Sequence, residues 1–393
     1  MGSDRRRFLG TGLAIVLSPS MRLGAEAAVQ SLQKVSSSRT NIPRERHVPK
    51  IILRQVIWSI TPVNPLSDKY TFAHSPTILR MPDDRLLTAW WALYLRGGCV
   101  LGAYSADGGE TWGKAETLSD ANDIGHANEA MLRDGNRVWL FYNLSLGYYA
   151  IPALGLKIVP SEGGEGGSQD CYYRYTDDGG KIWTQSRLLD RGSSLRANGI
   201  RLASGELLLG AYDQHASWVL KSSDRGKNWR RCGQVVTEST GLYEPCLLEL
   251  QDGRILMYLR ADDGYIWKAI SGDKGDSWSK PERTAIQQSG HPADLLRLRD
   301  GTVTLCYDAS NEQKRLVSRT TLSLRFSRDD CATWSEPLII EQQPDPLPEY
   351  VSIGYPSIAE NAAGDIVVVY YHKVQQKHSE SGTTQIKMVK VKL

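Results

Sequence analysis

The chain lacks the features that would assign it to several common classes of protein. No apolar run is long enough to span a bilayer as a permanent helix. Charge of one sign is not in excess either, because 47 lysine and arginine residues face 44 aspartate and glutamate residues. Without a basic stripe, a nucleic-acid-binding protein or a membrane-surface protein is not expected. No His-Glu-x-x-His motif or clustered aspartate run occurs, so neither a metal nor another cofactor is predicted.

Cysteine is also scarce and carries no recognisable pattern. The six cysteines are Cys99, Cys171, Cys232, Cys246, Cys306 and Cys331. Their spacings fit no zinc site. We expect most of them to be buried as small apolar residues, with no disulfide required for folding.

The N-terminus has the order of segments that is typical of an export signal. Residues 4–9 read Asp-Arg-Arg-Arg-Phe-Leu, a short apolar run follows at 13–17, and small residues surround Ala27. This order predicts a twin-arginine-type signal peptide over residues 1–27 and a disordered linker over 28–45. The mature protein is then expected in the periplasm or secreted from a bacterial cell.

An eight-residue pattern, Ser/Thr-x-Asp-x-Gly-x-x-Trp, occurs five times. The copies occupy residues 105–112, 176–183, 222–229, 271–278 and 327–334, and Cys331 replaces the glycine in the last one. Asp and Ser/Thr side chains bond back onto the backbone of a tight turn, Gly supplies a conformation that other residues resist, and Trp anchors the turn against its blade. Five copies predict a repeat array.

A second repeat, a pair of apolar runs split by a turn, interleaves with the first. It occurs at residues 77–91, 130–142, 199–212, 246–260, 294–307 and 357–371. Each copy predicts a β-hairpin. A hairpin with two further strands makes one blade, so we predict an all-β fold: a six-bladed β-propeller with four-stranded blades over residues 46–393 and negligible helix. The lone strand at 51–60 is expected to pair into the last blade and close the ring. The insertion at 145–170 is predicted to be a loop, either a lid over one face or a disordered surface segment.

The hairpins place polar residues at one end of the axis, opposite the repeated turns. The inner strands open at His74, His126, Arg196, Glu244, His291 with Asp294, and Tyr355; the next strands close at Trp91, Asn143, Asp213, Arg260, Asp308 and His372. Because the chain runs out and back, openings and closures lie at the same end. So many hydrogen-bonding groups around an axis predict a site for a polar ligand.

The repeated turns resemble the Asp-boxes, or BNR repeats, of the sialidase superfamily, and further residues match that family. Glu244 opens a fourth-blade strand and Arg260 closes its partner sixteen residues on, Arg319 precedes the fifth box by eight residues, and Tyr355 opens the sixth blade. The resemblance implies that Tyr355 is a nucleophile, that Glu244 accepts its proton, and that Arg260 and Arg319 bind a substrate carboxylate. A tyrosine titrates near pH 10 and needs such a base, and paired arginine donors suit a carboxylate.

Two departures from the family alter this prediction. His74 in His74-Ser-Pro stands where the family has an arginine, and residues 96–100 lack the family's acid/base aspartate. Glu129, Asp213 or Asp294 is the predicted substitute for the acid. His74, His126, Arg196 and His291 complete the predicted substrate-binding set.

Three functions are compatible with these residues. The first is an exo-glycosidase that removes a terminal acidic sugar, sialic acid or a related one, from glycans with retention through a tyrosyl intermediate. The second is a polysaccharide lyase acting on uronate-containing glycans, with His74, His126, Tyr355 and Arg260 in its site. The third is an inactive glycan-binding propeller. A glycan is the expected partner in each case, and a monomer is the expected state.

Overall fold

The strands of this protein are arranged in six separate antiparallel sheets. The computed structural model describes residues 48–60, 70, 72–94, 97–119, 126–145, 169–314, 319–344, 350–375 and 382–393. These residues form twenty-five strands and no helix, and thus no helix able to cross a membrane. The predicted signal peptide and linker, and residues 146–168 of the predicted insertion, lie outside the described residues.

The first three blades follow one another along the chain. Blade 1 contains β2 (Phe72–Arg80), β3 (Leu86–Tyr94), β4 (Gly97–Ser105) and β5 (Glu116–Thr117). Blade 2 contains β6 (His126–Asp134), β7 (Arg137–Ser145), β8 (Gln169–Thr176) and β9 (Arg187–Arg191). Blade 3 contains β10 (Ser194–Leu195), β11 (Ile200–Arg201), β12 (Leu207–Tyr212), β13 (Ser217–Ser222) and β14 (Arg230–Val235).

The remaining blades complete the set. Blade 4 contains β15 (Leu242–Glu249), β16 (Ile255–Ala261), β17 (Tyr265–Ser271) and β18 (Glu282–Gln287). Blade 5 contains β19 (Asp294–Arg297), β20 (Val303–Asp308), β21 (Thr321–Ser327) and β22 (Leu338–Gln342). Blade 6 contains β23 (Tyr350–Glu360), β24 (Ile366–Gln375), β25 (Gly382–Lys392) and β1 (Lys50–Ile60).

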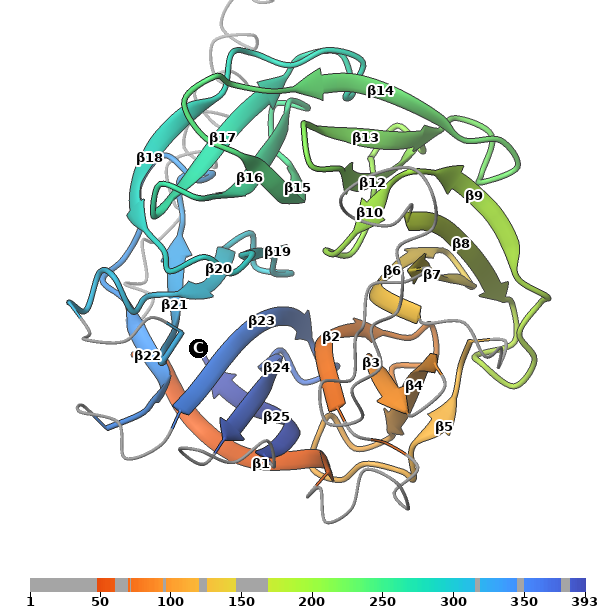
Figure 1. Cartoon of the computed structure of the whole chain (residues 1–393), viewed down its shortest axis with the longest axis vertical. Coiled ribbons are helices and arrows are strands. Elements are labelled where there is room, and N and C mark those ends of the chain that lie inside the picture. The colour runs from red at the N-terminus through yellow and green to blue at the C-terminus, as the bar shows by residue number, and fades with distance from the viewer. Residues whose placement is uncertain are drawn as a thin grey trace, which may run out of the picture. The chain divides into compact units, whose positions relative to one another are not determined.

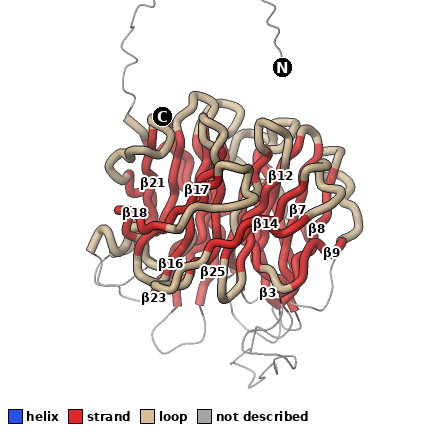
Figure 2. Tube along the Cα trace, turned by 90° about the horizontal axis from the view of Figure 1, so that it is seen from above, coloured by secondary structure: helices blue, strands red, loops and turns tan. Residues whose placement is uncertain are grey.

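The six blades stand in a ring, as predicted from the hairpins (Figure 1). In blades 1, 2, 4 and 5 the strands pair in chain order, and in blade 3 the inner position is shared by β10 and β11. Figure 2, turned by 90°, shows that the strands run between two faces, at which the connecting loops lie. The all-β, six-bladed prediction is therefore confirmed.

The first strand closes the ring from outside. β1 pairs antiparallel with β25, from Lys50 opposite Lys392 to Ile60 opposite Thr384. Blade 6 thus takes three strands from the end of the chain and one from its beginning, as the lone strand at 51–60 predicted. This pairing satisfies the backbone groups along one edge of β25.

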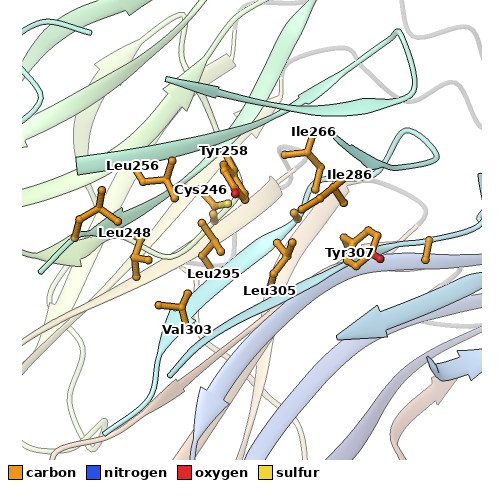
Figure 3. Close-up of a cluster of buried hydrophobic side chains, with 14 residues drawn as sticks. Cys246, Leu248, Leu256, Tyr258, Ile266, Ile286, Leu295, Val303, Leu305 and Tyr307 are labelled. Atoms are coloured by element: carbon orange, nitrogen blue, oxygen red, sulfur yellow. The ribbon is translucent and has the colours of Figure 1, made fainter. Parts of the chain in front are cut away.

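Apolar side chains fill each junction between neighbouring blades. Figure 3 shows one such cluster, in which Cys246, Leu256 and Tyr258 of blade 4 meet Leu295 and Leu305 of blade 5. Corresponding clusters join the other neighbouring blades. Burial of these side chains provides most of the driving force for closing the ring, because each blade covers an apolar face of the next.

The Asp-boxes form the predicted turns. In the first box, the amide of Gly109 donates to the Ser105 hydroxyl at 2.8 Å, and the amide of Thr111 donates to the Asp107 carboxylate at 2.9 Å. The other boxes repeat the bond to the hydroxyl at 2.7 to 2.9 Å. Cys331 adopts the same left-handed conformation as the glycines it replaces, with φ of 72°.

The box tryptophans lie at the junctions between blades. Trp183, Trp229, Trp278 and Trp334 pack on clusters that contain residues of their own blade and of the preceding one. Each box directly follows the third strand of its blade. The boxes therefore connect blades as well as strands.

Candidate active site

Antiparallel pairing brings the beginning of each inner strand beside the end of the next strand. Tyr243 pairs with Arg260, His74 with Trp91, and Gly354 with Tyr371. The boxes follow the third strand of a blade and so lie at the opposite face. We call the face that carries the strand openings the mouth.

The inner strands are irregular at the same level in four blades. Four residues there have a left-handed backbone without being glycine: Ser75 (φ 52°), Asn128 (φ 47°), Glu244 (φ 50°) and Tyr355 (φ 52°). Each lies within a register shift of its strand pair. Three of them precede a proline, which lacks the amide that regular pairing would use. Such strain in non-glycine residues is typical of functional sites.

Tyr355, Arg260 and Glu244 meet at the mouth. Nη1 of Arg260 donates to Oε2 of Glu244 at 2.8 Å and to the hydroxyl of Tyr355 at 3.4 Å. Tyr355 and Arg260 are partly exposed, whereas Glu244 is 3% exposed. No direct hydrogen bond between Tyr355 and Glu244 occurs among the described residues, but an oxygen of each lies within hydrogen-bonding distance of the same Arg260 nitrogen.

The phenol of Tyr355 is surrounded by aromatic rings. Its ring centroid lies 4.3 Å from that of His74, 5.0 Å from that of His291 and 5.9 Å from that of Tyr371. Burial raises the pKa of Tyr355 well above 10, and the Glu244 carboxylate raises it further, whereas Arg260 and Arg196 act in the opposite direction. The tyrosine is therefore protonated in the resting protein and needs a proton acceptor to react.

His74 is held as a neutral imidazole. Burial lowers its pKa well below 6.5, and the charges of Arg196 and Arg319 lower it further. Its Nδ1 lies 2.5 Å from the hydroxyl of Ser75. Where the family resemblance implies an arginine, this mouth thus presents an uncharged hydrogen-bonding group.

His291 is enclosed beneath these rings. It is fully buried, its Nδ1 lies 3.4 Å from Oδ2 of Asp308, and burial lowers its pKa. A Cβ atom at Gly354 would lie 1.9 Å from Nδ1 of His291, so only glycine fits there. His291 therefore positions the neighbouring strand and is closed to direct contact with a ligand.

Arg319 carries a second charge beside the mouth. It has φ of 63° and is partly exposed, and its Nη2 donates to the Gly290 carbonyl at 3.3 Å. Among the described residues no carboxylate forms an ion pair with it. Its charge lowers the pKa of both His74 and His291, which indicates that it lies near them. A guanidinium without a carboxylate partner can accept an anionic group from a ligand.

Two of the three candidate acids lie deep in the site. Glu129 is fully buried and neither carboxyl oxygen has a geometric hydrogen-bond partner; burial raises its pKa well above 4.5, although Arg196 favours the ionised form. Asp294 is 6% exposed and accepts from the amides of Ile358 and Leu295 at 2.8 and 3.1 Å. Burial raises the pKa of Asp294 to about 6. Both carboxyls can therefore hold a proton near neutral pH, and Glu129 has the less occupied oxygens.

The carboxylate of Asp213 is not part of the network around Tyr355. Asp213 accepts from the amides of His215 and Ala216 at 2.7 and 2.8 Å, so it caps its own turn. Tyr212 and Tyr371, which precede Asp213 and His372, make contacts within this network. Tyr212 accepts a hydrogen bond from Asn128 at 3.3 Å, and the ring of Tyr371 lies 4.2 Å from that of His74.

Sequence reasoning missed Tyr212 and Tyr371 because side chains alternate along a strand, and the closing position was placed one residue late. The sequence did contain a signal for the position of the site along the strands, because Ser75, Glu244 and Tyr355 each precede a proline. The side chain of His126 lies outside the described residues. Arg196 lies below the mouth and is 2% exposed, so contact with a ligand would require it to move.

The site has the parts for acid–base and nucleophilic chemistry on an anion. Within the described ranges, no group of three or more His, Cys, Asp or Glu side chains is arranged to hold a metal ion. Arg260 and Arg319 are partly exposed at the mouth, and the hydroxyl of Tyr355 lies beside Arg260. An anionic substrate would be bound with its reacting atom next to this hydroxyl.

Comparisons with known proteins agree with the architecture. Residues 153–368 match the model of the BNR repeat-like domain. No curated protein sequence matches the chain significantly.

Solved structures share the fold at low identity. A protein of unknown function from Dyadobacter fermentans superposes with a TM-score of 0.69 at 16% identity, covering 88% of this chain and 99% of the other. The NanB sialidase of Streptococcus pneumoniae gives 0.66 at 15% identity over 86% and 70% of the two chains. The leech intramolecular trans-sialidase gives 0.64 at 14% identity over 86% and 70%. At these identities the likeness concerns the fold.

Proposed function

The chain belongs to the BNR repeat-like domain family and has a sialidase-like propeller, and from that premise we propose an exported retaining exo-glycosidase that removes a terminal acidic sugar, sialic acid or a relative, from glycans. One observation carries the proposal. Arg260 contacts both the Tyr355 hydroxyl and the Glu244 carboxylate, and these three residues come from different strands of blades 4 and 6. A base, a nucleophile and a cation therefore converge where the sugar would react.

In the first step the Tyr355 oxygen attacks the anomeric carbon while its proton passes to Glu244. The bond to the leaving oxygen breaks, and an acid protonates that oxygen. Arg260 and Arg319 bind the sugar carboxylate, which a carboxylate nucleophile would repel but a phenol does not. In the second step water gives a proton to the acid that was deprotonated in the first step and attacks the anomeric carbon from the other face. The tyrosyl bond breaks, and Glu244 returns the proton to Tyr355.

Glu129 is the preferred acid among Glu129, Asp213 and Asp294. Its raised pKa keeps the proton that the leaving oxygen needs, and neither carboxyl oxygen has a hydrogen-bond partner of good geometry. Because Glu129 is 0% exposed, its side chain must become accessible when the substrate binds. Asp294 and Asp213 both accept backbone hydrogen bonds. Glu129→Gln is expected to reduce turnover strongly on natural glycans and little on activated aryl glycosides, which leave without a proton.

Hydrolysis is tested with fluorogenic aryl glycosides of acidic sugars. We expect wild type to release the fluorophore and Tyr355→Phe to lose about 10²-fold or more in kcat, because only the nucleophilic hydroxyl is removed. Tyr258→Phe is the matched control, since Tyr258 is a buried tyrosine packed against the box residue Trp334, with ring centroids 6.4 Å apart. Proton NMR of the first product should show retained configuration. Near-normal turnover by Tyr355→Phe would contradict the mechanism.

A glycan-binding propeller without turnover is the second candidate. The observation that favours it is the burial of Glu129 and Asp294, which are 0% and 6% exposed. Binding of an acidic oligosaccharide without any product would support this function. An unsaturated product that absorbs in the ultraviolet would instead support the lyase.

Export is part of the proposal and rests on residues 1–27 alone. The paired arginines before Phe8 are expected to direct transport of the folded protein. Replacement of Arg5, Arg6 and Arg7 by lysine should leave the protein in the cytoplasmic fraction of a bacterial host. Unchanged fractionation would contradict this assignment.

A further inference from the structure

Arg196 lies across the base of the mouth. It sits in the interval between β10 (Ser194–Leu195) and β11 (Ile200–Arg201), where the inner strand of blade 3 does not pair with β12. With 2% of its surface exposed, it is among the largest fully buried side chains of the protein. A charged side chain at such a depth needs a structural or functional reason.

The guanidinium reaches two other blades. Its Nη2 donates to the carbonyl of Pro356 in blade 6 at 3.1 Å and to the carbonyl of Pro76 in blade 1 at 3.4 Å. Its Cζ lies 5.1 Å from the centre of the Tyr355 ring. One side chain of blade 3 therefore contacts the backbone on which Tyr355 is mounted and also the face of its ring.

The two carbonyls belong to a strained part of the backbone. Pro356 follows Tyr355 and Pro76 follows Ser75, and both preceding residues have φ of 52°. Register shifts between Gly354 and Ser357, and between His74 and Thr77, leave these segments outside regular strand pairing. Arg196 thus supplies hydrogen bonds that the neighbouring strand does not, and it stabilises a conformation that residues before proline rarely adopt.

An ordinary ion pair does not account for Arg196. Within the described residues no carboxylate lies in ion-pair contact with it; Glu129 and Asp294 are near enough for its charge to act on them, but burial raises the pKa of both. A buried cation held mainly by carbonyl oxygens is costly to desolvate. Neutral hydrogen-bond donors could hold the same carbonyls with a smaller desolvation free energy.

We propose that Arg196 is a positioning residue that fixes the hydroxyl of Tyr355 for attack on the sugar, an inference that rests on the proposed glycosidase function. It acts through the Pro356 carbonyl and the ring face and does not bind the substrate. Its charge also stabilises the electron-rich oxygen that forms as Tyr355 loses its proton.

The test compares Arg196→Met, Arg196→Lys and the control Arg174→Met in the full chain. Arg174 also donates to a carbonyl across a blade junction, that of Leu118 at 2.7 Å, and to the Thr184 carbonyl of its own blade at 2.9 Å, but it lies beside an Asp-box. With an aryl N-acetylneuraminide as substrate, Arg196→Met is expected to lower kcat by about 10²-fold with KM changed by less than about threefold. Arg196→Lys should restore part of kcat, because it keeps the charge and one donor. Arg174→Met should keep kcat within about twofold.

A crystal structure of each Arg196 variant separates this inference from the proposed function. We expect the ring of Tyr355 to shift and its φ to leave the left-handed region in Arg196→Met, whether or not wild type hydrolyses the glycoside. If Arg196→Met does not fold, Arg196→Lys serves for both measurements. An unmoved Tyr355, or equal losses of kcat in the Arg196 and Arg174 variants, would overturn the positioning role. Absence of hydrolysis by wild type, with Tyr355 displaced in the variant, would overturn only the glycosidase function.

Discussion

The two faces of the propeller use the same backbone conformation for opposite purposes. At the box face, left-handed residues lie in turns whose polar groups are satisfied locally, as in the bond from the Thr111 amide to Asp107 at 2.9 Å. At the mouth, left-handed Glu244 and Tyr355 interrupt the inner strands and contact residues from distant parts of the chain. Because the hydrogen bonds of a box are made within its own turn, the same turn can be repeated in different blades. The conformation of the mouth residues instead depends on contacts between blades.

The titration of carboxyl groups differs in the same way. Hydrogen bonds from Thr111 lower the pKa of Asp107 to about 2 at the box face. Burial raises the pKa of Asp294 to about 6 at the mouth. A site that transfers protons needs groups that are not already stabilised as ions, so the strain and burial of the mouth are useful for the proposed chemistry.

Gly354→Ala should have the largest effect and should act on activity. The new Cβ would lie 1.9 Å from Nδ1 of His291, whose ring packs 5.0 Å from that of Tyr355. Displacement of these rings is expected to lower kcat by about 10²-fold and to destabilise the fold by about 1–3 kcal/mol. Kinetics and urea unfolding measure the two effects. Gly272→Ala, which meets nothing within 4 Å, is the control; an active Gly354→Ala would show that the mouth tolerates movement.

Gly226→Ala should act on stability alone. This box glycine has φ of 78°, and a Cβ would lie 2.3 Å from Cζ2 of Trp139 in the preceding blade. The left-handed conformation and the clash together predict a loss of about 3 kcal/mol. Gly301→Ala, with φ of 90° and nothing within 4 Å, isolates the backbone cost of about 1 kcal/mol. Equal losses in the two variants would mean that the box does not lock neighbouring blades together.

Asp294→Asn and Asp107→Asn should change the pH dependence of stability in opposite windows. With its pKa raised from 3.8 to about 6, Asp294 binds more protons folded than unfolded, so its contribution is present at low pH and is lost as pH rises from about 4 to 7. Asparagine removes that loss, which is on the order of 3 kcal/mol. Asp107, lowered to about 2, contributes above pH 4 and loses its contribution as pH falls toward 2.

The Asp107 effect should be the smaller of the two, because its carboxylate is exposed and screened by solvent. Urea unfolding between pH 4 and 7, and thermal unfolding between pH 2 and 4, measure the two windows. If both substitutions changed the pH dependence of the unfolding free energy in the same direction, the proposed contrast between the two faces would be contradicted.

The fold was predictable because its determinants are local and repeated. The sequence contains five boxes and six hairpin patterns, and it leaves the strand at 51–60 without a neighbouring partner, so that pairing with the last blade could be predicted. The level of the site was predictable for the same reason, since Glu244, Arg260 and Tyr355 open or close strands. The contacts of Tyr212 and Tyr371 were not, because a register shift of one residue changes which side of a strand a side chain occupies. The burial of Arg196 and Glu129 depends on how six blades tilt toward one axis, which no segment of sequence determines alone.

The pairing of β1 with β25 makes the order of folding differ from the order of synthesis. Residues 50–60 emerge from the ribosome early, yet their partner is the last strand, eleven residues long, at Gly382–Lys392. Blades 1 to 5 have contiguous strands and can form as they appear, but the first strand, whose exposed side chains include Ile52 and Val56, must wait until residues 382–392 have been synthesised. Without residues 382–392, β1 and β24 would each be left with an unpaired edge on an open ring. Closure of the ring thereby depends on two segments that are far apart in the chain.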